Sequence, residues 1–185
     1  PLDFSVLYVR DLERLRRVFT LVPDVLRGDT IEGEKNYMDY GIQLGRRFRA
    51  LKAWVIWRSL GRGGIVSRMR EQIRLANLLA GWINSDDRFE VAAQVSMGVV
   101  CFRFVGPVAG VGDAGPGSST AATAKKIDEL NSAIVEQINA SGRAYLTQTK
   151  LRGRTVLRIG LGNVLTTEAH LHKAWELLRE TTSKL

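Results

Sequence analysis

From residue 86 onward, the chain alternates between strand-like and helix-like patterns in an order that leaves few folds open. The six expected elements are, in order, strands over 89–95 and 98–105, a helix over 124–139, strands over 143–149 and 154–160, and a final helix capped by Thr166. The strand segments hold alternating or continuous apolar residues, whereas the helices repeat apolar residues every three or four positions. This order predicts a small antiparallel sheet with helices on one face.

The first 85 residues carry weaker patterns. We expect a strand over 4–9, a short helix from the N-cap Asp11 to Phe19, a loop over 20–43, and helices over 44–60 and 65–83. The glycines at 61, 63 and 64 separate the last two helices. A loop of about 20 residues is uncommon in a compact domain and is often functional.

The composition fits a globular chain, because 45% of its 185 residues are hydrophobic. Four helical stripes are candidates for the core: Phe48, Leu51, Trp54 and Val55; Met69, Ile73, Ala76 and Ala80; Ile127, Leu130, Ile134 and Ile138; Leu171, Ala174, Trp175 and Leu178. The single cysteine, Cys101, excludes a disulfide framework and a cysteine-based metal site within the chain. No apolar run reaches the ~20 residues that span a bilayer, so we expect no membrane segment.

The net charge of +8 is concentrated in one segment. Residues 44–74 carry nine basic side chains and one acidic side chain. Three interpretations stay open on this evidence: a basic face that is solvated or paired elsewhere, a nucleic-acid surface in which arginines neutralise phosphates, or capture of one small anion at a helix N-terminus. A nucleic-acid module would use Arg46, Arg47, Arg49, Lys52 and Arg58.

The residues that often carry catalysis are not grouped in the sequence. His170 and His172 lie two positions apart in the final helix and so point to different sides. Lys173 is expected to be a solvated charge, and Cys101 a buried, inert thiol in a strand. We therefore predict no catalytic residue and no metal site on this chain.

Several motifs together resemble a known family. The most specific is Leu44-Gly45-Arg46-Arg47-Phe48-Arg49-Ala50-Leu51-Lys52-Ala53-Trp54, followed by Arg58. Further matches are Arg88-Phe89-Glu90-Val91, Val100-Cys101-Phe102-Arg103, Ile138-Asn139, Tyr145-Leu146-Thr147, Val156-Leu157-Arg158, His170 and Ala174-Trp175. The chain resembles, over nearly its whole length, the group II pyridoxal-phosphate-dependent decarboxylases, which include the aromatic L-amino acid and histidine decarboxylases.

This resemblance implies the carboxyl-terminal part of an α/β enzyme of pyridoxal-phosphate fold type I. Residues 1–69 would finish the large cofactor-binding domain, and residues 70–185 would form a small α+β domain with an antiparallel sheet. The lysine that holds pyridoxal 5'-phosphate would lie upstream of Pro1, so the chain alone should be inactive. The complete enzyme would be a cytoplasmic homodimer that converts an aromatic or related L-amino acid into an amine and CO2.

The resemblance also assigns roles to residues of the basic segment and of the loop before it. The loop 21–43 would close over the active site of the neighbouring subunit. Leu44 and Gly45 match positions whose backbone approaches the cofactor phosphate, and Gly45 also matches a position beside the substrate side chain. Glycine at this position resembles the aromatic amino acid enzymes, and serine resembles the histidine enzymes.

One residue departs from the family pattern. Val25 matches a loop tyrosine that is associated with protonating the intermediate after CO2 leaves, and valine has no proton to donate. Three explanations stay open. Another group or water protonates the intermediate, the reaction is diverted to an aldehyde product, or the match of the loop to the family is shifted in register. A catalytically inactive relative would also fit Val25, and it stands as an alternative beside the nucleic-acid module.

Val25 gives the first testable prediction. If the product is diverted, Val25→Tyr in the complete enzyme should raise the ratio of amine to aldehyde, because tyrosine restores a proton donor. Both products can be measured by chromatography of single-turnover reactions. An unchanged ratio would eliminate the diversion hypothesis.

Overall fold

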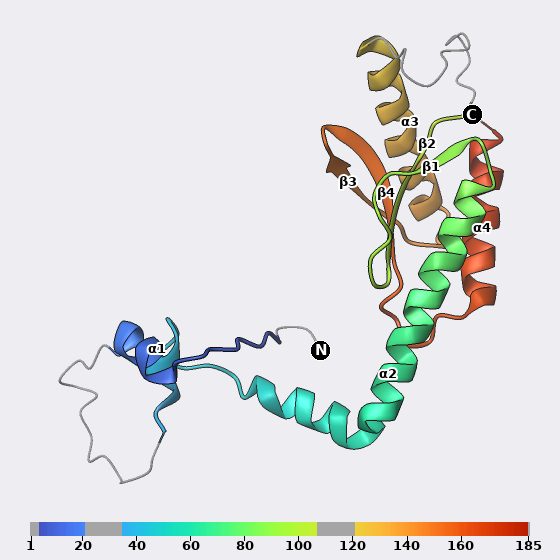
Figure 1. The fold of residues 1–185 in the computed structure, drawn as a ribbon. Helices are drawn as coiled ribbons and strands as arrows, with labels where there is room; N and C mark the ends of the chain where they lie inside the picture. Colours follow the sequence, from blue (N-terminus) through green and yellow to red (C-terminus); the bar gives the residue numbers. More distant parts are fainter. Residues whose placement is uncertain (1–3, 21–34, 107–120, 185) are drawn as a thin grey trace. The chain divides into compact units, whose positions relative to one another are not determined.

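The computed structural model describes residues 4–20, 35–106 and 121–184. Its elements are α1 (Leu12–Phe19), η2 (Tyr37–Tyr40), α2 (Arg49–Asn84), β1 (Phe89–Val91), β2 (Val99–Phe104), α3 (Ala121–Ala140), β3 (Thr147–Leu151), β4 (Arg154–Gly160) and α4 (Glu168–Thr182). The chain divides into two compact units, residues 1–62 and 63–185 (Figure 1).

The boundary between the units falls beside a break within α2. Gly61 has φ 62° and ψ 175°, which interrupts the helical backbone. This combination is accessible essentially to glycine alone. The expected break between two helices is therefore confirmed: the run from Arg49 to Asn84 consists of two helices that meet at a kink, and of the three glycines only Gly61 leaves the helical conformation.

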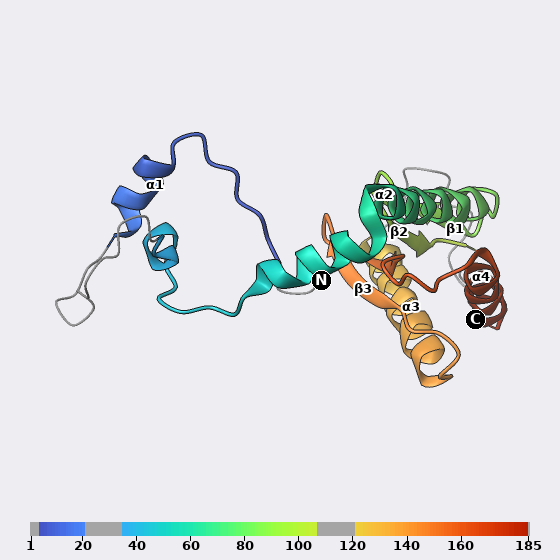
Figure 2. The ribbon, with the colours of Figure 1, turned by 90° about the horizontal axis from the view of Figure 1, so that it is seen from below.

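The second unit contains the predicted antiparallel sheet. Its strand order is β1-β2-β4-β3, and every neighbouring pair is antiparallel. In the central pair, Val100 faces Ile159 and Phe102 faces Leu157. These residues belong to the face of the sheet that packs on α2, α3 and α4. Figure 2 shows the three helices grouped around the sheet.

Three of the four expected helical stripes contribute to the core, whereas the stripe of Phe48, Leu51, Trp54 and Val55 is 46–74% exposed and lies outside it, contrary to the expectation from sequence. The core includes Leu75, Ala76, Leu79, Ala80 and Ile83 of α2, Ile134 and Ile138 of α3, and Leu171, Trp175 and Leu178 of α4. The ring of Phe89 lies 5.0 Å from that of Trp175, which joins the first strand to the last helix. Burial of these apolar side chains is the main source of stability in the unit.

Two polar side chains of α3 form hydrogen bonds with β2 and β4 where these strands no longer pair with each other. The paired residues of these strands stop at Phe102 and Leu157. Beyond that point, Asn131 accepts a hydrogen bond from Phe104 N–H at 2.8 Å and donates one to the Phe104 carbonyl at 2.9 Å. Asp128 accepts from Thr155 N–H at 3.0 Å and from buried Arg103 at 2.7 Å. Backbone groups that the sheet leaves unpaired are thus satisfied by a helix.

A carboxylate links the start of the sheet to α4. Asp86 lies 2.8 Å from Nη2 of Arg88 and 3.4 Å from Nε of Arg179. The hydrogen bond from the Arg88 side chain, reinforced by the charges of both arginines, holds the pKa of Asp86 below its ordinary value. Asp86 and Arg88 lie in the turn between α2 and β1, and the contact of Asp86 with Arg179 fixes this turn against α4.

Several expectations from sequence are wrong in detail. Residues 4–9 form no strand, because no neighbouring strand pairs with them in the described part of the chain. The first strand of the sheet ends at Val91 and not at residue 95. Met69 is 42% exposed, outside the core. The N-cap of α4 is Thr167, whose hydroxyl accepts from His170 N–H, and not Thr166.

Asn131 provides a test of the packing between α3 and the sheet. Asn131→Ala removes three hydrogen bonds and leaves Phe104 N–H and C=O buried without partners. We expect the free energy of unfolding to fall by about 2–4 kcal/mol, measured by urea denaturation with far-ultraviolet circular dichroism as the signal.

The matched control is Gln137→Ala, on the exposed side of the same helix. This substitution should change the free energy of unfolding by less than about 0.5 kcal/mol. Equal effects of the two substitutions would show that Asn131 does not hold β2 against α3.

Candidate functional site

The predicted cofactor-binding residues, Leu44 and Gly45, lie in the short segment that joins η2 to α2. Two interactions hold this segment within the first unit. Asp39 of η2 is buried and lies 3.5 Å from Nε of Arg16 on α1. Nη2 of Arg46 donates a hydrogen bond to the Tyr37 carbonyl at 3.3 Å. Because Arg46 reaches back to η2, the loop that contains Leu44 and Gly45 is closed at its base.

Leu44 and Gly45 are open to solvent at this loop. The Leu44 side chain is 66% exposed. A Cβ atom built on Gly45 would have no neighbour within 4 Å, and the φ of Gly45 is not positive. Neither packing nor backbone conformation in the described part of the chain therefore requires glycine at position 45. A requirement for glycine here would have to come from a molecule or chain that approaches it.

The start of α2 has the character of an anion-binding position. The helix dipole favours negative charge at the start of a helix, where the first amides have no partner four residues back. Here the amides of Arg49 and Leu51 donate to the carbonyls of Arg47 and Phe48. Arg47 and Arg49 flank this end, and no acidic side chain occupies the first turn. Nε of Arg49 is buried without a hydrogen-bond partner. The loop and the helix start can therefore accept an anionic group.

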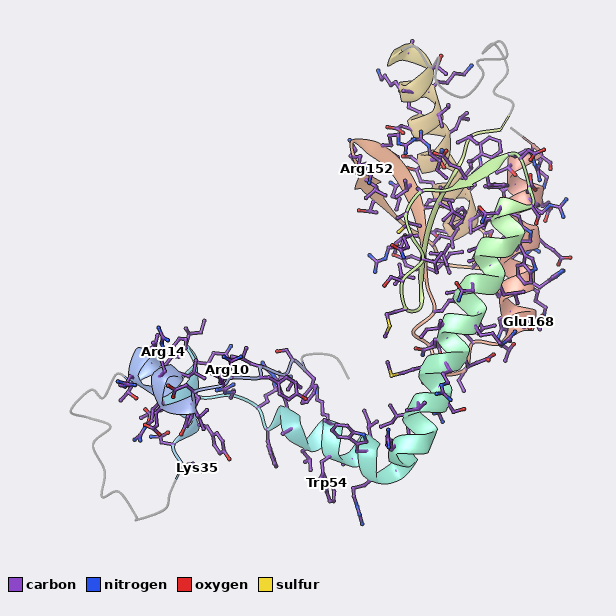
Figure 3. The ribbon with its side chains drawn as sticks, viewed as in Figure 1. Arg10, Arg14, Lys35, Trp54, Arg152 and Glu168 are labelled. Carbon is purple, nitrogen blue, oxygen red and sulfur yellow. The ribbon has the colours of Figure 1, made fainter. Side chains whose placement is uncertain are left out.

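The remaining part of the basic segment is apolar and aromatic as well as cationic. The guanidinium of Arg58 lies 5.9 Å from the centre of the Trp54 ring, at cation–π distance. Figure 3 shows Trp54 pointing outward from the first part of α2. Sequence periodicity did not reveal which cations have a role within the fold: Arg46 closes the loop, and Arg58 pairs with an aromatic ring.

Other candidate residues do not join this segment. Val25 and residues 21–34 of the predicted active-site loop lie outside the described residues. His170 completes the N-terminal capping box of α4, and His172 lies 3.4 Å from Glu176 and against the edge of Trp82. Lys173 is exposed, whereas Cys101 is half-buried and not fully buried as expected.

The described residues offer little else of a catalytic kind. Within them, no three His, Cys, Asp or Glu side chains are grouped to hold a metal ion. Nor does any helix of the described part have the length and apolarity needed to cross a membrane. A cavity of about 60 Å³ beside Arg68 and Thr166 in the second unit is far smaller than a typical ligand pocket of roughly 300–1,000 Å³.

Comparison with known sequences identifies the family. Residues 1–105 match the family model described as the pyridoxal-dependent decarboxylase conserved domain. The whole chain is 34% identical to tryptophan decarboxylase 1 of Oryza sativa subsp. japonica and 33% identical to tyrosine decarboxylase 1 of Narcissus pseudonarcissus. It covers 34% and 35% of the length of these two proteins. The chain thus spans about a third of the curated relatives that it matches.

Solved structures give the same assignment. The crystal structure of Oryza sativa TDC with PLP and tryptamine matches 95% of this chain with a TM-score of 0.78 at 32% identity. The structure of Catharanthus roseus tryptophan decarboxylase in complex with L-tryptophan matches 91% with a TM-score of 0.69 at 30% identity. This chain covers 34% and 33% of those two chains. Sequence, family model and fold agree, and the chain belongs to the family of pyridoxal-dependent decarboxylases.

Proposed function

We propose that this chain is the carboxyl-terminal third of a decarboxylase that converts an aromatic or related L-amino acid into its amine and CO2. The observation that carries this proposal is the match of the whole chain, at 30–34% identity, to tryptophan, tyrosine and aromatic-L-amino-acid decarboxylases. The relatives differ in their named substrates, so the substrate class is an aromatic amino acid and not one particular compound.

The residues of the first unit fit the phosphate side of pyridoxal 5'-phosphate. The helix start beside Arg47 and Arg49 carries no carboxylate that would repel a phosphate. Gly45 leaves the space around its Cα open. When bound, pyridoxal phosphate would act as the electron sink that allows the carboxyl carbon to leave. Leu44 and Gly45 would present backbone groups to its phosphate, and Gly45 would leave room for a large substrate side chain.

The rest of the reaction machinery would come from outside this chain. We infer that the lysine that attaches the cofactor lies upstream of Pro1, and that the chain alone is inactive. We further infer that residues 1–69 complete the large domain and residues 70–185 form the small one. The complete enzyme would work in the cytoplasm as a homodimer, in which the loop 21–43 of one subunit covers the active site of the other.

The proposal can be tested by joining this chain to the amino-terminal two-thirds of rice tryptophan decarboxylase 1 in one polypeptide. The joined protein should bind pyridoxal phosphate, absorb near the wavelength of a lysine-bound cofactor, and release an amine from L-tryptophan or L-tyrosine. This chain alone is the control and should do none of these.

The outcome separates the alternatives. A joined protein that binds the cofactor but forms neither amine nor aldehyde would identify an inactive relative. A joined protein without cofactor, together with nucleic-acid affinity of the chain that falls steeply with salt, would favour the basic module instead.

Gly45 tests the assignment of the substrate side of the site. Gly45→Ser in the joined protein should lower kcat/KM for L-tryptophan by about tenfold or more, because the added side chain takes space beside a large substrate. It should leave the free energy of unfolding within about 0.5 kcal/mol of the unmodified value, because the surroundings of Gly45 are open.

The matched control is Gly162→Ser, at another glycine with no neighbour within 4 Å of a built Cβ. It should change neither quantity. A loss of stability in Gly45→Ser that matches the loss of activity would mean that Gly45 supports folding and not substrate choice.

A further inference from the structure

The described part of the first unit buries a single residue, and that residue is an acid. Asp39 is 6% exposed, and Nε of Arg16 on α1 lies 3.5 Å from its carboxylate. A carboxylate that is removed from water needs a cation or hydrogen-bond donors to compensate its charge. Asp39 also precedes Leu44 and Gly45 in the segment that leads to α2, where a negative charge opposes the binding of an anion. The burial of an acid at this place therefore requires an explanation.

A second arginine holds the same short helix. The side chain of Arg46 donates to the carbonyl of Tyr37, the first residue of η2, and this bond joins residues that are nine positions apart. Nη2 of Arg46 would lie 3.4 Å from a Cβ atom built on Gly41, so the guanidinium runs beside the backbone of the loop that it closes. Leu44 and Gly45 lie within this closed loop.

The helix η2 connects the two arginines. Its N-cap Asn36 accepts a hydrogen bond from Met38 N–H at 3.3 Å, and its carbonyl accepts one from Asp39 N–H at 3.2 Å. These local bonds fix the turn from which the Asp39 side chain reaches Arg16. A continuous set of contacts therefore runs from α1 through η2 to the start of α2. We call the three side chains that form it, Arg16, Asp39 and Arg46, the clamp.

We propose that the clamp positions the backbone of Leu44 and Gly45 for the phosphate group of pyridoxal 5'-phosphate. Asp39 and Arg46 are then positioning residues that do not touch the phosphate. This inference rests on the proposed function. A loop that is fixed before its ligand arrives loses less conformational entropy on binding, which raises its affinity. Because the guanidinium of Arg46 is used within the loop, the exposed Arg47 is the neighbouring cation that attracts the anion.

The alternative is that these side chains influence an anion through their charge alone. In that case, removal of the negative charge of Asp39 would strengthen phosphate binding, because the surroundings of the phosphate would become more positive. The clamp predicts the opposite sign, since loss of the charge of Asp39 weakens the contact that holds η2 against α1. Substitution of Asp39 therefore separates the two explanations by the direction of the effect.

Asp39→Asn tests this direction in the joined protein described above. The variant should raise the dissociation constant of pyridoxal 5'-phosphate by about fivefold or more, measured by titration of the cofactor absorbance, because the loop is no longer fixed in advance. The matched control is Glu13→Gln, which removes the same charge from an exposed position on α1 outside the clamp. The control should leave the dissociation constant unchanged or lower it by at most about twofold.

Hydrogen exchange without cofactor reports on the loop itself. The amides of Leu44 and Gly45 should exchange faster in Asp39→Asn and in Arg46→Met than in the unmodified joined protein, because each substitution opens the clamp. The amides of β4 that pair with neighbouring strands are the internal control, and their slow exchange should not change. Unchanged exchange in β4 separates opening of the loop from general unfolding.

A double substitution tests whether Arg16 and Asp39 act through one contact. Arg16→Gln and Asp39→Asn together should raise the dissociation constant no further than the stronger of the two single substitutions, because both remove the same ion pair. Effects that multiply would mean that each side chain influences the cofactor separately, and they would overturn the proposal.

The remaining outcomes are equally decisive. Weaker cofactor binding in Asp39→Asn, with faster exchange of the loop and unchanged exchange of β4, supports the proposal. Unchanged or tighter binding overturns it, and amine formation by the unmodified joined protein then leaves the proposed function standing. Weaker binding without faster exchange of the loop, or with loss of protection in β4, also overturns it. An unmodified joined protein that binds no cofactor overturns both this inference and the proposed function.

Discussion

The structure depends on burial of one face of the four-stranded sheet. Phe102 and Leu157 face each other at its centre, and α2, α3 and α4 cover them. Because strand residues alternate between faces, this burial fixes the register of every strand at once. It also determines where α3 lies, and so allows Asp128 and Asn131 to satisfy the backbone groups that β2 and β4 leave unpaired. The polar contacts refine a geometry that apolar burial imposes.

The need to bury apolar side chains also explains why the first unit differs from the second. Its residues make specific polar contacts, such as Arg16 with Asp39 and Arg46 with Tyr37, and α1 is properly capped by Asp11. A helix cap, or an ion pair whose arginine is half exposed to water as Arg16 is, contributes only a small stabilisation, about 1 kcal/mol or less. Such contacts select a local conformation, but the described residues of the first unit bury no apolar side chain that would hold these contacts together.

The chemistry of the candidate site follows from this division of roles. The described residues hold no group of three His, Cys, Asp or Glu side chains that could bind a metal ion. They contribute a loop closed by Arg46, open space at Gly45 and a helix start flanked by arginines. These features can position an anionic group.

The sequence by itself determined the family, the antiparallel sheet and most of the helical stripes, because periodicity and capping are local properties of neighbouring residues. The tertiary structure decided what depends on distant partners. Residues 4–9 have the composition of a strand but no strand beside them in the described part of the chain, and of the three glycines expected to separate two helices only Gly61 leaves the helical conformation. Asn131 is read as an ordinary polar helix residue until Phe104, far along the chain, is placed against it. A hydrogen bond between distant residues leaves no periodic trace, so only the folded chain reveals it.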